Sequence, residues 1–176
     1  MMTKLYKREL YLKKIRGFYN DTEIIKVITG IRRCGKSSLL DTIIDELKEQ
    51  GVKDKDIIEI KLDKRPNKNI KTPDQLDKLI ESYILDNDFK YIFLDEIQNV
   101  KGFEEIIEGY RNEKKYSIFI TGSNSYLLSG ELITKLTGRK IEIEMLPLNF
   151  YEYIDIKKFL NISLKESIYD EFEQYI

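Results

Sequence analysis

Histidine is absent from this 176-residue sequence, and cysteine occurs once, at Cys34. The lack of histidine excludes His-dependent catalytic triads and His-ligated zinc sites. A lone cysteine excludes a disulfide within the chain. Any acid–base chemistry must therefore come from other side chains.

A dominant charge and a long apolar run are also missing. The 30 lysines and arginines balance 31 aspartates and glutamates, so the net charge of −1 gives no support for nucleic-acid binding through a polycationic surface. No apolar stretch approaches the roughly 20 residues of a membrane span, and Met1–Leu10 lacks the apolar centre of a signal peptide. We therefore expect a cytoplasmic protein without membrane contact, and its length suits one domain with extensions.

The most informative stretch is Gly30-Ile31-Arg32-Arg33-Cys34-Gly35-Lys36-Ser37, which follows a β-branched run and precedes a helical pattern. In that context it is typical of a phosphate-binding loop, because glycines let backbone N–H groups face an anion. Lys36 would reach the β- and γ-phosphates, and the Ser37 hydroxyl would bind Mg²⁺. The alternative is an ordinary glycine-rich turn. The predicted nucleotide-binding residues are Gly30, Arg32, Arg33, Cys34, Gly35, Lys36, Ser37 and Ser38.

Some residues of this loop allow two interpretations. Arg32 and Arg33 either neutralise phosphate or pair with acids across a subunit face. Cys34 is interpreted as a small residue tolerated beside the phosphates rather than as a redox switch.

Strands and helices alternate along the chain. Apolar or alternating runs predict strands at 24–29, 57–62, 91–94, 116–120 and 141–145, with helical patterns between them. Such alternation requires crossover connections, so we expect an α/β fold in which helices cover both faces of a parallel sheet. Ligands in these folds bind beyond the carboxyl ends of the strands.

The core is assigned to residues 21–146, and both ends of the chain are expected to be helical. Residues 1–20 are basic and aromatic, and they form either a solvated face or a phosphate contact, with Tyr6–Tyr11 as the candidate base pocket. Residues 147–176 are amphipathic, and they stop in mid-pattern, as in a chain cut from something longer.

Two acidic residues, Asp95 and Glu96, directly follow the apolar run Tyr91–Leu94. Phosphoryl transfer to water needs a metal ion, a group that orients the water, and positive charge near the transition state. We expect Asp95 to hold Mg²⁺ together with Ser37, and Glu96 to polarise the attacking water. An acidic pair at a strand end is a weak signal alone and a stronger one after a phosphate-binding loop.

Asn124 and Arg139 complete the predicted catalytic set with Lys36 and Glu96. Ser123-Asn124 follows the fourth strand, so Asn124 would bond to the γ-phosphate or the water, unless the pair is only a helix cap. Arg139 would deliver positive charge, either within the chain or to a neighbouring subunit; the alternative is a surface ion pair with an acid such as Glu142. All of these groups are expected at one sheet edge.

With these motifs the sequence resembles a prokaryotic family of AAA-type ATPases in the AAA+ superfamily. The motifs that carry the resemblance are the phosphate-binding loop, Phe93–Gln98, Thr121–Ser129, Leu136–Arg139 and Leu146–Tyr153. The resemblance implies a P-loop three-layer αβα sandwich with strand order 5-1-4-3-2, ATP as ligand, and Arg139 as an arginine finger. Members usually continue into winged-helix-like and nuclease-like segments.

The function expected is Mg²⁺-dependent ATP binding and hydrolysis that drives a conformational change in a C-terminal region. Expected partners are ATP and that region, while a homo-oligomer, DNA or another protein is left open. The alternatives are a nucleotide-gated switch with little turnover, which binds DNA or a protein, and a small-molecule kinase. The kinase is disfavoured because no Arg-rich lid segment is present.

Overall fold

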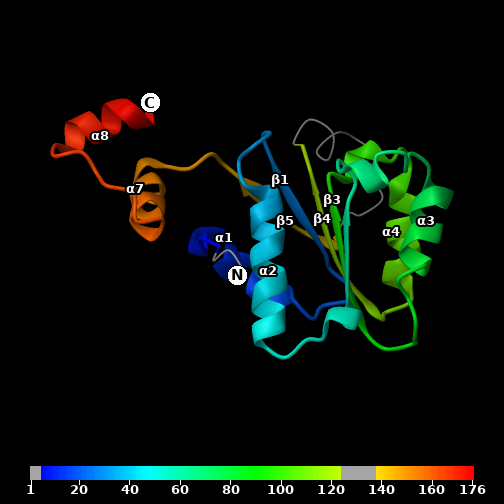
Figure 1. Ribbon diagram of the computed structural model, residues 1–176. Coiled ribbons are helices and arrows are strands. Elements are labelled where there is room, and N and C mark those ends of the chain that lie inside the picture. Colours follow the sequence, from blue (N-terminus) through cyan, green and yellow to red (C-terminus); the bar gives the residue numbers. More distant parts are fainter. Residues whose placement is uncertain (1–4, 124–137) are drawn as a thin grey trace.

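The computed structural model describes residues 5–123 and 138–176. Its strands are β1 (Ile25–Gly30), β2 (Ile57–Lys61), β3 (Lys90–Asp95), β4 (Tyr116–Gly122) and β5 (Lys140–Met145). They form one parallel 5-stranded sheet in the order β2-β3-β4-β1-β5 (Figure 1). Both the parallel sheet and the strand order 5-1-4-3-2, read from the other edge, are confirmed.

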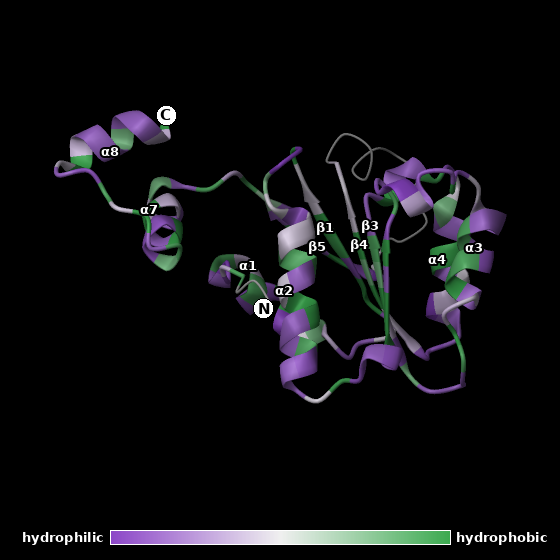
Figure 2. Ribbon diagram, viewed as in Figure 1, coloured by the Kyte–Doolittle hydropathy of each residue, from purple (hydrophilic) through white to green (hydrophobic). Residues whose placement is uncertain are grey.

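The position of each strand in the sheet explains its sequence. Every residue of β1, β3 and β4 is buried, because these strands have a neighbour on both sides and helices on both faces. The edge strands β2 and β5 instead alternate between buried and more exposed residues. Figure 2 shows the central strands as predominantly hydrophobic and the outward surfaces of the helices as hydrophilic.

Helices cover both faces of the sheet and complete the three layers (Figure 1). One buried cluster joins the sheet to α1 (Glu9–Ile15) and α2 (Lys36–Glu49). The other joins it to α3 (Pro73–Glu81) and α4 (Phe103–Asn112). Short 3-10 helices lie at Arg16–Phe18, Asp54–Asp56, Arg65–Asn67 and Ile97–Asn99.

Sequence signals account for both ends of α3. Thr72 is the N-cap, in a capping box with Gln75. The helix ends at Glu81, and Tyr83 just beyond it is 46% exposed. Ser82 follows Glu81, and Asp86, Asn87 and Asp88 come soon after it; these residue types favour turns over a further helical turn.

The C-terminal extension forms α7 (Phe150–Phe159) and α8 (Ile168–Tyr175), set off from the sheet in Figure 1. Aromatic contacts join the two helices, among them Phe150 against Phe172 and Tyr175 at ring-centroid distances of 5.1 and 5.5 Å. In the part of the chain that the structure describes, every helix is too short or too polar to cross a membrane.

Candidate functional site

The predicted phosphate-binding loop connects β1 to α2 and depends on two glycines. Gly30 has φ +151°, and a Cβ there would lie 2.5 Å from the Met145 carbonyl oxygen, so only glycine fits against β5. Gly35, with φ +98°, adopts a conformation that glycine tolerates best. Helix α2 begins directly afterwards at Lys36, so its positive end and its free N–H groups meet the loop. This arrangement favours binding of an anion.

Lys36 and Glu96 come together at this loop. The buried Lys36 ammonium donates to the carbonyl oxygens of Gly30 and Ile31, both at 3.1 Å. A carboxylate oxygen of Glu96, which directly follows β3, lies 3.7 Å from it. Two residues predicted separately from the sequence are thus close in space, one able to attract phosphate and the other to accept a proton.

Asp95 is fixed in place by Thr121, a residue for which the sequence analysis predicted no role of its own. The buried Asp95 carboxylate accepts a hydrogen bond of 2.5 Å from the Thr121 hydroxyl on the neighbouring strand β4. The same hydroxyl oxygen accepts a bond of 3.0 Å from the Glu96 backbone N–H. Thr121 therefore orients both acidic residues, and its position at the end of β4 was the signal available in the sequence.

A cavity of about 320 Å³ opens beside these groups, and Lys36, Glu96 and Ser123 line it together with Arg32 and Gln98. Glu96 has a positive φ of 58°, an uncommon conformation for a residue with a Cβ. Its carboxylate accepts a hydrogen bond from the Gln98 amide. The predicted Asn124 lies outside the described residues.

A second cavity, of about 240 Å³, lies on the other side of the loop. Leu5 and Tyr6 of the N-terminal segment line it with Leu148 and Ile156 of the C-terminal extension, and Cys34 and Ser38 border it on the loop side. Of the candidate base pocket Tyr6–Tyr11, Tyr6 faces this cavity, whereas Tyr11 is buried in the core.

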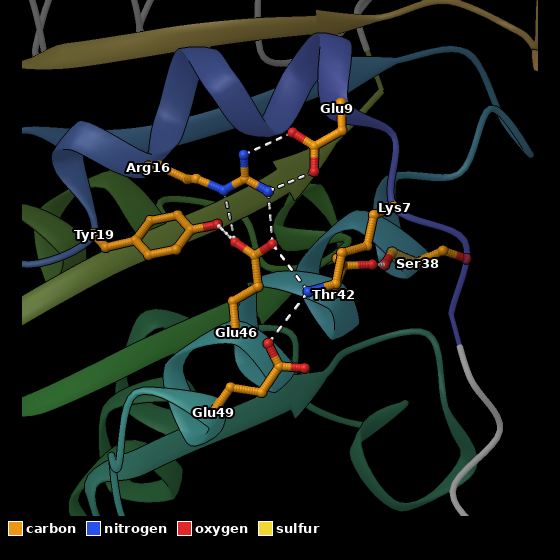
Figure 3. Close-up of polar contacts among 8 residues, drawn as sticks. All are labelled: Lys7, Glu9, Arg16, Tyr19, Ser38, Thr42, Glu46 and Glu49. Atoms are coloured by element: carbon orange, nitrogen blue, oxygen red, sulfur yellow. Dashed lines mark hydrogen bonds and ion pairs between the residues drawn. The ribbon is translucent and has the colours of Figure 1, made fainter.

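Lys7, Arg8 and Arg16 of the N-terminal segment form ion pairs, as Figure 3 shows for Arg16. Its guanidinium bonds to Glu9 and Glu46, while the Tyr19 hydroxyl donates to Glu46 at 2.8 Å. The hydrogen bond from Arg16 lowers the pKa of Glu46 to about 2, although burial opposes the shift. Lys7 pairs with the same glutamate at 3.3 Å. This network holds α1 against α2, the helix that begins at the loop.

Arg139 does not lie at this edge of the sheet, contrary to the expectation that all the predicted groups would converge there. Its carbonyl accepts from the N–H of Ile25, the first residue of β1, so Arg139 lies at the amino edge. The six residues of β1 span roughly 16 Å between that edge and the loop. Its half-exposed guanidinium pairs with Glu108 on α4 at 2.9 Å, rather than with Glu142. A role within its own chain is thereby disfavoured.

Arg32 and Arg33 are exposed on the loop. Arg32 borders the cavity that contains Glu96, and Arg33 borders the cavity that contains Tyr6. Ser37 is half-buried in the first turn of α2. The structure thus brings together the loop, Asp95 and Glu96 at the carboxyl edge.

A family model of the AAA domain matches residues 22–154. The chain belongs to the AAA domain family. An uncharacterized protein of Haemophilus influenzae is 38% identical to this AAA chain over 177 residues, which cover 99% of the chain and 44% of the relative. An uncharacterized protein of Methanocaldococcus jannaschii is 37% identical over 167 residues, which cover 92% of the chain and 36% of the relative. The chain therefore spans less than half of either relative.

Solved structures share the fold of this AAA chain. AMPPCP-bound DnaA from Aquifex aeolicus matches with a TM-score of 0.59 and 17% identity, over 95% of this chain and 56% of that one. The Aeropyrum pernix ORC1 protein in complex with DNA matches with a TM-score of 0.60 and 15% identity, over 89% and 49% of the two chains. At such identities the likeness supports the AAA+ P-loop α/β fold alone.

Proposed function

We propose that this AAA chain binds ATP with Mg²⁺ at the loop Gly30–Ser37 and hydrolyses it. The observation that carries the proposal is the approach of the Glu96 carboxylate to within 3.7 Å of the Lys36 ammonium at the mouth of an anion-binding loop. In phosphoryl transfer to water, one group must stabilise the phosphate charge and another must accept a proton from the water. Lys36 supplies the first function and Glu96 the second.

The residues present fit a magnesium ion. Ser37 offers a hydroxyl oxygen and Asp95 a carboxylate oxygen, which are the hard ligands that Mg²⁺ prefers, and Thr121 orients the carboxylate. When bound, Mg²⁺ neutralises phosphate charge. The remaining negative charge of the phosphates would be stabilised by the loop amides, by Lys36 and by the positive end of α2.

The cavity lined by Tyr6 and Ile156 is the proposed base pocket. It borders Gly35 and Ser38 at the start of α2, and its lining combines an aromatic ring and aliphatic side chains with Arg8 and Arg33. Such surfaces suit a planar, mostly apolar base. A base held there would lie next to the loop that receives the phosphates.

A nucleotide-gated switch with little turnover is the second candidate. It is favoured by one observation: the Glu96 carboxylate is engaged by both Lys36 and Gln98. A carboxylate held in this way is poorly placed to accept a proton until phosphate draws Lys36 away. In either case we propose that nucleotide binding changes the position of the C-terminal region, with DNA, a protein or further copies of the chain as candidate partners.

Phosphate release from ATP distinguishes the two candidates. We expect Mg²⁺-dependent release that falls about 100- to 10,000-fold in Glu96→Gln, the usual contribution of a general base, while ATP still binds. Glu105→Gln, an exposed substitution on α4, is the matched control and should leave release unchanged. Release equal to wild type in Glu96→Gln would remove Glu96 from the mechanism, and ATP binding without release would favour the switch.

A further inference from the structure

Arg8 connects three parts of the chain that are distant in sequence. Its side chain is 8% exposed, although it lies in the first segment that the structure describes. The guanidinium donates to the carbonyl oxygen of Cys34 in the loop at 2.9 Å and to that of Leu146, after β5, at 3.1 Å. It also makes two hydrogen bonds of 2.8 Å to the carboxylate of Glu152 on α7.

On the loop side, the bond to Cys34 fixes one peptide unit of the phosphate-binding loop. The C=O and N–H of a trans peptide point in opposite directions, so holding the Cys34 carbonyl toward Arg8 also directs the Gly35 N–H away from it. That N–H is one of the loop amides available to an anion. An anion on the Gly35 N–H and Arg8 on the Cys34 carbonyl therefore favour the same peptide orientation.

On the other side, Arg8 binds the first turn of α7. Glu152 is the third residue of α7, and it accepts from the Asn149 backbone N–H in the capping box while it pairs with Arg8. Burial raises the pKa of Glu152, but the hydrogen bonds from Arg8 and from the Asn149 N–H, together with the charge of Arg8, lower it further, so the pair is charged. The bond to the Leu146 carbonyl adds a second contact to the segment that leads into α7.

We propose that Arg8 is a positioning residue that couples occupancy of the phosphate-binding loop to the docking of α7 against the core. The inference rests on the proposed nucleotide binding and names the residue through which that binding reaches the C-terminal extension. Coupling is reciprocal, so nucleotide strengthens the docking of α7, and the docked α7 strengthens nucleotide binding.

Hydrogen–deuterium exchange of α7 tests this coupling, with and without a non-hydrolysable ATP analogue. In the wild-type chain we expect the analogue to slow exchange of the α7 amides roughly 5- to 150-fold, the usual range of coupling between sites. In Arg8→Gln the analogue should still bind, at a higher Kd, and the slowing of α7 exchange should shrink to what contact of the base with Ile156 of α7 leaves. Titration calorimetry measures binding independently.

Two further variants separate coupling from damage to the fold. Arg8→Gln alone leaves the Glu152 carboxylate without its cation. The double variant Arg8→Gln/Glu152→Gln removes both charges, and its glutamine can still complete the capping box at the third position of α7. This double variant should retain basal protection of α7, and its response to the analogue should be reduced to the same extent as in Arg8→Gln. Arg16→Gln, which loosens the same N-terminal segment without touching the loop or α7, should keep the response.

Each outcome identifies the claim that fails. Analogue that binds the wild type without slowing α7 exchange would overturn the coupling, as would an undiminished response in both Arg8 variants. Loss of the response in Arg16→Gln as well would assign the effect to the docking of α1 rather than to Arg8, and would also overturn it. Absence of analogue binding to the wild type would overturn the proposed function itself, and this inference with it.

Discussion

Lys26 should make the stability of the protein depend on pH above neutrality. This lysine on β1 is fully buried, and its ammonium donates to the Asp21 carbonyl at 2.6 Å and the Ser117 hydroxyl at 2.7 Å rather than to a carboxylate. Burial lowers its pKa from 10.5 to about 7, against a smaller opposing attraction from Asp21. The folded chain therefore binds fewer protons at this site than the unfolded chain between those two values.

The sign and size of the effect follow from proton linkage. Where the unfolded state binds more protons, the free energy of unfolding rises with pH. For pKa values of about 7 folded and 10.5 unfolded, Lys26 contributes a rise of about 2 kcal/mol between about pH 7 and about pH 9. Lys26→Met should abolish this rise and should increase stability most at the lower pH.

Urea unfolding followed by circular dichroism across this range measures the effect as the difference between wild type and Lys26→Met. Lys90→Met is the matched control, because Lys90 is equally buried but paired with Asp56 at 2.8 Å and with Asp86. Burial lowers its pKa, but these hydrogen bonds outweigh burial and raise it, so its contribution stays constant until more alkaline pH. A difference between wild type and Lys26→Met that does not vary with pH would refute the reasoning.

Two further predictions concern the site. Thr121→Val keeps the side-chain shape but removes the hydrogen bonds to Asp95 and Glu96. Mg²⁺ affinity, measured from the metal dependence of phosphate release, should therefore fall about 10- to 100-fold. An unchanged metal dependence would contradict this role of Thr121. If Arg139 acts on a neighbouring subunit, inactive Arg139→Ala mixed with inactive Glu96→Gln should recover part of the phosphate release, and no recovery would argue against action between subunits.

Secondary structure was accessible from the sequence because local pattern and packing agree. Burial on both faces makes Tyr91–Leu94 a continuous apolar run. In the helices between the strands, the apolar residues that face the core recur with the helical period. The strand order came from the family resemblance instead. Insertion of β4 between β1 and β3 depends on pairings between distant residues, such as Lys26 with Phe119, and no local pattern encodes these.

The place of a candidate residue in the fold was predictable where that residue directly follows a strand or starts a helix, as Glu96 and Lys36 do. The prediction for Arg139 was wrong because this residue precedes β5 rather than following it. In a parallel sheet, a residue that precedes a strand lies at the edge opposite the carboxyl ends. Arg8 was missed for another reason. Its partner Glu152 is 144 residues away, and the sequence marks that glutamate only as part of a helix start.

The central claim, that the loop Gly30–Ser37 is a nucleotide site, is tested most directly by titration calorimetry with a non-hydrolysable ATP analogue and Mg²⁺. Lys36→Ala should weaken binding about 10- to 150-fold, because a hydrogen bond to a charged group contributes about 1.5–3 kcal/mol. Lys48→Ala, near the other end of α2, should bind like wild type. Equal affinity in the wild type and Lys36→Ala would contradict the account.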